Sequence, residues 1–190
     1  MIRCKNTLAT LGMAALGIAS LGVASTLLIP TASAAPARTH QTALATLFSG
    51  TAQVELQEHF AGEAVLAGLV GTNTANLKES IKGETWEHKT MYPGFAKQAT
   101  KDGCTAAAAL FTEIAADEGG HAAAYTLALK SLTNPKVKVP KPQTVAPVVI
   151  TASTPACPGT KTQVNLLDAM HGEAFAYAKY TAYALQAARH

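Results

Sequence analysis

The sequence is poor in cysteine, tryptophan and acidic residues, and these shortages exclude several classes of protein. It has three Cys, one Trp and twelve acidic side chains in 190 residues. No Cys-x-x-Cys pair occurs, which argues against a zinc site or an iron site held by four thiolates. The formal net charge is only +3, so no surface for nucleic acid is indicated.

Because acidic residues are so few, each glutamate needs an explanation of its own. The chain has nine Glu and three Asp, and alanine covers much of the predicted helix surface where charged residues are usual. A carboxylate that is buried without a partner costs several kcal/mol. Glutamates on such helices are therefore candidates for a specific chemical role.

The first 34 residues are predicted to be a secretory signal peptide. Arg3 and Lys5 precede an apolar stretch over about residues 7–28, and Ala32-Ser33-Ala34 fits the small-x-small cleavage rule. The alternative is an uncleaved membrane anchor, because the apolar stretch approaches spanning length. We favour removal, which leaves residues 35–190 exported, periplasmic or secreted, without a stable membrane anchor. The mature chain then has 13 basic and 12 acidic residues.

The mature chain reads as one all-α domain with a proline-rich linker. Residues 133–161 contain six prolines and no helical period, which predicts an extended linker. No β-strand pattern is convincing. Hydrophobic periodicity and helix stop signals predict four helices: from about Gln41 to between Ala61 and Val70, from about Thr74 to Thr100, from about Thr105 to Leu132, and from about Thr162 almost to the C-terminus.

Each predicted helix carries at least one candidate metal ligand. Glu84 and Glu87, and likewise Glu118 and His121, are three residues apart and so share a helix face. Paired ligands at this spacing build dinuclear carboxylate sites inside four-helix bundles. The other two helices carry Glu173 and the group Glu55, Glu58 and His59. Carboxylate and imidazole ligands without thiolate suit iron or manganese.

Three segments resemble the rubrerythrin family. The segment Gly83–Pro93, with Phe95-Ala96 and then Ile114–His121, is similar to the second half of a rubrerythrin. Asn165–Glu173, with Tyr180-Thr181, resembles that family's first helix. The segment from Leu47 to His59 resembles its second helix. What is normally the first helix therefore comes last, as in a circularly permuted ferritin-like four-helix bundle.

The resemblance implies a role for each matched side chain. It implies two iron ions, with manganese as the alternative. It also implies phenol groups that orient the carboxylate ligands without binding the metal. The implied metal ligands are Glu55, Glu84, Glu87, Glu118, His121 and Glu173, and the implied phenols are Tyr92 and Tyr180.

The sequence also departs from the family pattern. Glu58 stands where the family has its histidine, and His59 follows one place later. Both share a face with Glu55, and we favour His59. Glu63 is a further rival because Gly62-Glu63-Ala64 resembles Gly172-Glu173-Ala174. The rubredoxin-like electron-transfer domain of the family is absent from this sequence.

The link between the first two helices decides how the bundle closes. If the first helix ends near Gly62, about twelve residues remain before the second helix. When extended they span roughly 40 Å, enough to run back along the bundle. If it continues to Val70, the short link forces an antiparallel hairpin. The site then needs a rearranged topology or a helix exchanged between two chains, which makes a homodimer with helix exchange one of the expected assemblies. Whether Cys104 and Cys157 pair is left open.

The resemblance implies a function in oxidative-stress protection. We expect a peroxidase-type oxidoreductase that reduces hydrogen peroxide to water at a dinuclear iron site, with electrons from an external donor. No nucleic-acid partner is expected. The alternatives are an iron- or manganese-binding or storage protein without efficient peroxidase turnover, and a structural bundle whose site has decayed.

Overall fold

The computed structural model describes residues 34–189, and these residues form helices joined by turns and one extended segment. No strand occurs within this range, which confirms the all-α prediction. Apart from Ala34, the predicted signal peptide lies outside the described residues. Within the described range, no helix combines the length and apolarity needed to cross a membrane.

The first helical run has three parts: α1 (Ala34–Val54), the π-helical η1 (Glu55–Phe60) and α2 (Ala61–Leu66). It ends because Gly68 takes a left-handed conformation, with φ of 62°, that stops a helix. The next helix begins after Thr72, whose hydroxyl accepts a hydrogen bond from the Ala75 amide at 3.2 Å. The connection is therefore short, as in the antiparallel-hairpin alternative.

The second run was predicted as one helix and contains a π-helical insert. It consists of α3 (Asn73–Trp86), η2 (Glu87–Met91) and α4 (Tyr92–Lys101). Gly103, with φ of 73°, makes the tight turn into α5 (Thr105–Ser131). The last helix, α6, spans Lys161–Ala187.

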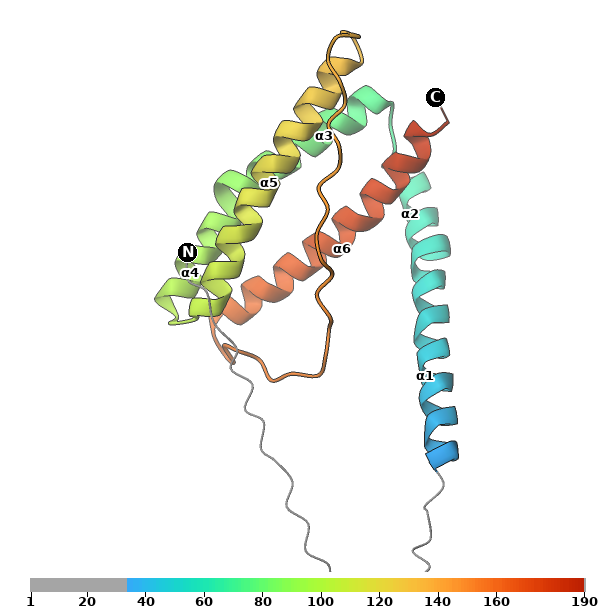
Figure 1. The fold of residues 1–190 in the computed structure, drawn as a ribbon, viewed down its shortest axis with the longest axis vertical. Helices are drawn as coiled ribbons and strands as arrows, with labels where there is room; N and C mark the ends of the chain where they lie inside the picture. Colours follow the sequence, from blue (N-terminus) through green and yellow to red (C-terminus); the bar gives the residue numbers. More distant parts are fainter. Residues whose placement is uncertain (1–33, 190) are drawn as a thin grey trace, which may run out of the picture. The chain divides into compact units, whose positions relative to one another are not determined.

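The linker returns the chain along the bundle, so α5 and α6 begin at the same end. Figure 1 shows the extended segment running back from the end of α5 to the region where α4 meets α5. α6 then passes α3 in the opposite direction, with Tyr180 contacting Glu84 and Lys179 contacting Glu79. Among the described residues, those up to Leu44 and those from Ala45 onward form separate compact units, and the bundle belongs to the second unit.

The well-packed part of the bundle lies where α4, α5 and the start of α6 meet. Tyr92 and Phe111 are fully buried, and their rings lie 6.0 Å apart. Phe95 contacts both rings, at 6.2 and 5.4 Å. These aromatic contacts hold η2 and α4 against α5. They therefore fix where Glu87 of η2 and Glu118 of α5 lie along the bundle axis.

Two interactions fasten α6 to the turn between α4 and α5. A disulfide joins Cys104 to Cys157, which answers the question that the sequence left open. Asp102 Oδ2 accepts hydrogen bonds from the Thr162 amide at 2.9 Å and from its hydroxyl at 2.7 Å. The carboxylate thereby caps the start of α6 from a different helix, and these Thr162 hydrogen bonds lower the pKa of Asp102.

We predict that Asp102→Asn lowers the melting temperature near neutral pH, because the amide loses the charge-assisted hydrogen bonds. A carboxyl whose pKa is lowered by folding stabilises above its ordinary value of 3.8 and loses this contribution as pH falls. Thermal unfolding followed by circular dichroism should therefore show a difference near neutral pH that shrinks below about pH 3.8. Asp168→Asn, an exposed carboxylate of α6, is the control. An Asp102 effect that persists unchanged in acid would contradict this assignment.

Candidate metal centre

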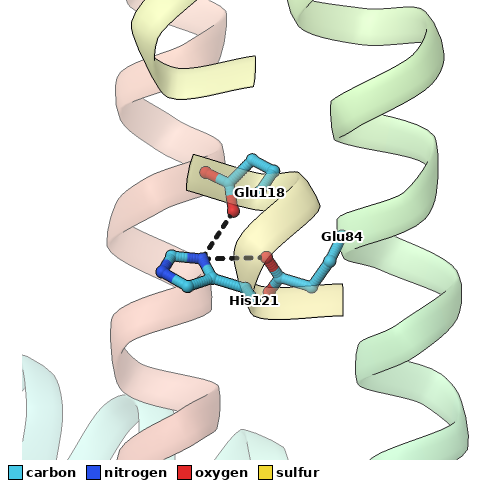
Figure 2. A group of neighbouring side chains, drawn as sticks. All are labelled: Glu84, Glu118 and His121. Atoms are coloured by element: carbon cyan, nitrogen blue, oxygen red, sulfur yellow. Dashed lines mark hydrogen bonds and ion pairs between the residues drawn. The ribbon is translucent and has the colours of Figure 1, made fainter. Parts of the chain in front are cut away.

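Three side chains from two antiparallel helices meet inside the bundle. Glu84 comes from the last turn of α3, and Glu118 and His121 come from the middle of α5 (Figure 2). His121 Nδ1 lies 2.8 Å from Glu118 Oε2 and 3.2 Å from Glu84 Oε2. Among the described residues, these three have ligand atoms that all lie within 4.8 Å of one another.

The two carboxylates are buried, and their charge governs the electrostatics. Glu84 is 2% exposed and Glu118 is 6% exposed. Burial raises the pKa of Glu118, and the nearby charge of Glu84 adds to this, so that it reaches about 7. Burial also raises the pKa of Glu84, but hydrogen bonds from His121 and Tyr180 outweigh this effect and hold the pKa low. Hydrogen bonds to both carboxylates raise the pKa of His121 to about 10.

The predicted phenols lie against the predicted ligands. Tyr180 Oη donates a hydrogen bond to Glu84 Oε1, and Tyr92 Oη donates one to Glu173 Oε1. Burial and the carboxylate partners raise the pKa of both tyrosines, so each phenol keeps its proton. Each is therefore a permanent donor that fixes one oxygen of a carboxylate, and the other oxygen of Glu84 faces His121.

Two further acidic candidates border the buried group. Burial raises the pKa of Glu87, and the charges of Glu84 and Glu173 raise it further, so the three carboxylates influence one another. Glu173, from α6, lines a cavity of about 290 Å³ together with Glu118 and His121. The linker closes one side of this cavity through Gln143, whose amide donates to Asp117 at 3.0 Å.

Both π-helical segments begin at a predicted ligand. η1 begins at Glu55 and η2 at Glu87. A π-helical turn inserts an extra residue, which shifts the following side chains around the axis, and such turns are frequent at functional sites. Side-chain periodicity does not reveal them, because an insert of one residue changes the apolar pattern little.

The candidates on the first helical run lie apart from this group. Glu55 Oε2 is 3.0 Å from His59 Nδ1, and both side chains are exposed, at 63% and 55%. Glu58 and Glu63 are exposed as well. The structure thus brings together Glu84, Glu118 and His121, places Glu87 and Glu173 beside them, and leaves the four candidates of η1 and α2 in solvent.

One histidine contributes to the packing beside the site without being a candidate ligand. His88 donates from Nδ1 to the Ala115 carbonyl at 2.6 Å, one turn before Glu118. Its ring lies so close to Gly119 that an added Cβ there would be 2.8 Å from His88 Nδ1. The first glycine of Glu118-Gly-Gly-His121 therefore makes room for the contact between η2 and α5. In the sequence, the signal for this close contact is the pair of adjacent glycines inside a predicted helix.

The two glycines should respond oppositely to alanine. Alanine normally stabilises a helix interior by about 0.8–1.0 kcal/mol relative to glycine. At Gly120, nothing lies within 4 Å of the added Cβ, so Gly120→Ala should raise the melting temperature by about 2–4 °C. Gly119→Ala should lower it, because His88 must move and lose its hydrogen bond. Equal stabilisation by both substitutions in calorimetry would refute the packing role of Gly119.

Comparison with known proteins identifies the family of this chain. The rubrerythrin family model matches residues 31–129. A rubrerythrin from Porphyromonas gingivalis is 37% identical over 59 residues, covering 31% of this chain and 30% of the relative. Rubrerythrin-1 from Clostridium acetobutylicum is 40% identical over 68 residues, covering 36% and 35%. The chain thus spans about a third of the length of these curated relatives, and no solved structure matches. Because the family model covers more than half of the sequence, the chain belongs to the rubrerythrin family.

Proposed function

We propose that this protein is an exported non-haem di-iron peroxidase, which reduces hydrogen peroxide to water with electrons from an external donor. The observation that carries the proposal is the pair of buried carboxylates, Glu84 and Glu118, that converge on one imidazole. Membership of the rubrerythrin family supports iron as the metal. The disulfide between Cys104 and Cys157 supports export, because such bonds persist in oxidising compartments.

The residues present fit a divalent cation. Two buried carboxylates face a single imidazole, and burial, with a further contribution from neighbouring carboxylates, raises the pKa of Glu118 and of Glu87. A proton on His121 Nδ1 bridges the carboxylates at the position where a cation can bind their oxygens. Oxygen and imidazole donors suit iron or manganese, and both cysteines of the described range are held in the disulfide.

Five side chains would hold the metal pair, namely Glu84, Glu87, Glu118, His121 and Glu173. When bound, a dinuclear iron centre supplies Lewis acidity and the two electrons that cleave the O–O bond of peroxide. The protein's part is to place and orient the oxygens. Tyr180 holds Glu84 Oε1, so that Oε2 is directed to the side of His121.

On the α6 side of the site, a tyrosine likewise orients a carboxylate. Tyr92 is fully buried and holds one oxygen of Glu173, which itself is exposed and lines the 290 Å³ cavity. This cavity is large enough for peroxide and is bordered by the linker residues Gln143 and Val145. Small solutes would therefore enter between α5, α6 and the linker.

Loss of the buried carboxylates should sharply reduce metal binding. Glu84→Gln and Glu118→Gln keep the side-chain volume but remove the charge, so iron in the purified protein should fall from about two ions per chain to below one. Metal analysis by mass spectrometry is the measurement, and Glu113→Gln, an exposed glutamate of α5, is the control. Unchanged iron in both core variants would exclude the dinuclear site. Two ions per chain without peroxide consumption would favour metal storage instead.

Removal of the Tyr180 hydroxyl should impair the site without removing a ligand. Tyr180→Phe frees Glu84 Oε1, and loss of such an orienting partner typically costs about 10–100-fold in metal affinity or activity. Tyr177→Phe removes the same hydroxyl from a 69% exposed tyrosine of the same helix and should change neither. Donor-dependent peroxide consumption and iron titration, measured side by side, test this prediction. Identical behaviour of the two variants would contradict an orienting role.

A further inference from the structure

One lysine of α6 is buried beside the candidate metal centre. Lys179 is 7% exposed, whereas every other lysine and arginine within residues 39–189 is exposed. It directly precedes Tyr180, the phenol that donates to Glu84. Burying an ammonium group costs several kcal/mol unless charged and polar groups surround it. The position of Lys179 therefore calls for an explanation of its own.

A glutamate of α3 holds this ammonium group. Lys179 Nζ lies 3.3 Å from each carboxylate oxygen of Glu79. Tyr183 Oη donates to Glu79 Oε2 at 3.2 Å, so the carboxylate accepts from two side chains of α6. The side chain of Glu79 is 50% exposed, and that of Lys179 is only 9% exposed. The ion pair thus begins at the surface of α3 and places its positive end in the interior.

The ammonium group also lies against two aromatic rings of its own helix. Lys179 Nζ is 4.8 Å from the centroid of the Tyr180 ring and 5.7 Å from that of the Phe175 ring. A cation within about 6 Å of a ring centroid is attracted by the negative face of the ring. Successive helix residues point about 100° apart, so the lysine side chain bends toward the ring of its neighbour. Glu79, on the facing helix, holds it in that bend.

The ring of Tyr180 has few other neighbours that fix its position. The Tyr125 ring lies 5.4 Å from it and the Tyr183 ring 6.1 Å, measured between centroids. Because the hydroxyl is at the far end of the side chain, a small tilt of the ring moves it away from Glu84 Oε1. The two rings and the ammonium group therefore determine together where this hydrogen bond forms.

The charge of Lys179 also reaches the carboxylates of the site. Burial and the charges of Glu84 and Glu173 raise the pKa of Glu87, and the positive charge of Lys179 acts in the opposite direction. A fixed positive charge near a metal site repels the cation. Charge alone therefore predicts that Lys179 weakens metal binding, whereas an orienting role predicts that it strengthens metal binding. The two effects have opposite signs, so an experiment can separate them.

We propose that Lys179 is a positioning residue: its ammonium group, held by Glu79, fixes the ring of Tyr180 and thereby the orientation of Glu84. The consequence for metal binding rests on the proposed function, but the contact between Lys179 and Tyr180 does not. The role requires a cation at a fixed point over the ring. Arginine should therefore preserve it, and an uncharged side chain of similar length should not.

The metal-free protein provides the first test. Full-length protein carries ¹³C at the ζ carbon of its tyrosines, and the Tyr180 NMR signal is the one absent from Tyr180→Phe. In mixed H₂O and D₂O this signal reports how fast the hydroxyl proton exchanges. Lys179→Met should accelerate exchange by about 2–30-fold, the range that corresponds to one cation–π contact, and Lys179→Arg should restore slow exchange. Lys97→Met, at an exposed lysine of α4, is the control. Unchanged exchange in Lys179→Met overturns the proposal.

Anaerobic titration with ferrous iron provides the second test. Lys179→Met should lower the iron affinity by about 2–30-fold, because Glu84 loses its fixed orientation. Lys179→Arg should recover most of this loss, and Lys97→Met should bind iron as the wild-type protein does. An equal or higher iron affinity in Lys179→Met would show that the lysine acts on the metal only as a repelling charge. That result also overturns the positioning role.

A variant of the partner residue keeps the lysine in place. Glu79→Gln removes the charge that holds the ammonium group, so the Tyr180 hydroxyl should exchange faster although the positive charge remains. Exchange at the wild-type rate would contradict the role given to Glu79. Wild-type protein that takes up no iron would remove the proposed function, whereas the exchange rate of Tyr180 would still decide for or against the role of Lys179.

Discussion

The structure depends on the burial of two like charges at one point. Glu84 and Glu118 come from antiparallel helices and are nearly inaccessible to water, and one imidazole lies between their oxygens. Bringing two carboxylates together in a low-dielectric interior is unfavourable unless positive charge accompanies them. Every neighbouring feature serves this condition: Tyr180 donates to one carboxylate, and the α4–α5 aromatic cluster fixes the height of α5 against α3. The bundle is therefore built around a point that needs positive charge, and the proton on His121, whose pKa is raised to about 10, supplies it in this structure.

Much of the fold follows from local signals in the sequence. Gly103 and the proline-rich segment predict helix boundaries, and the structure has helix boundaries at the same two places, between α4 and α5 and between α5 and α6. The spacing of Glu118 and His121 also predicts that these two side chains converge, because i and i+3 positions share a face in any α-helix. These features need no knowledge of tertiary packing, so a single sequence suffices to locate them.

Other features depend on how distant segments meet, and the sequence does not determine these. The path of a 29-residue linker decides whether Cys104 and Cys157 approach each other, and its composition sets no path. The π-helical inserts at Glu55 and Glu87 are backbone hydrogen-bond patterns with little trace in side-chain periodicity. η1 meets α6 through an aromatic contact between Phe60 and Phe175, and no local pattern in the sequence pairs these two rings.

The disulfide has a consequence for how freely the linker can vary. Because Cys104 and Cys157 are joined, the start of α6 stays beside the α4–α5 turn whatever the chain does between Ser131 and Cys157. The effective concentration of Glu173 and Tyr180 at the site is then set by a covalent bond instead of by linker length. Insertions, deletions and changes of composition in this stretch cost little, provided that Gln143 can still reach Asp117. The proline-rich linker can therefore vary in sequence while the disulfide keeps Glu173 and Tyr180 in place at the site.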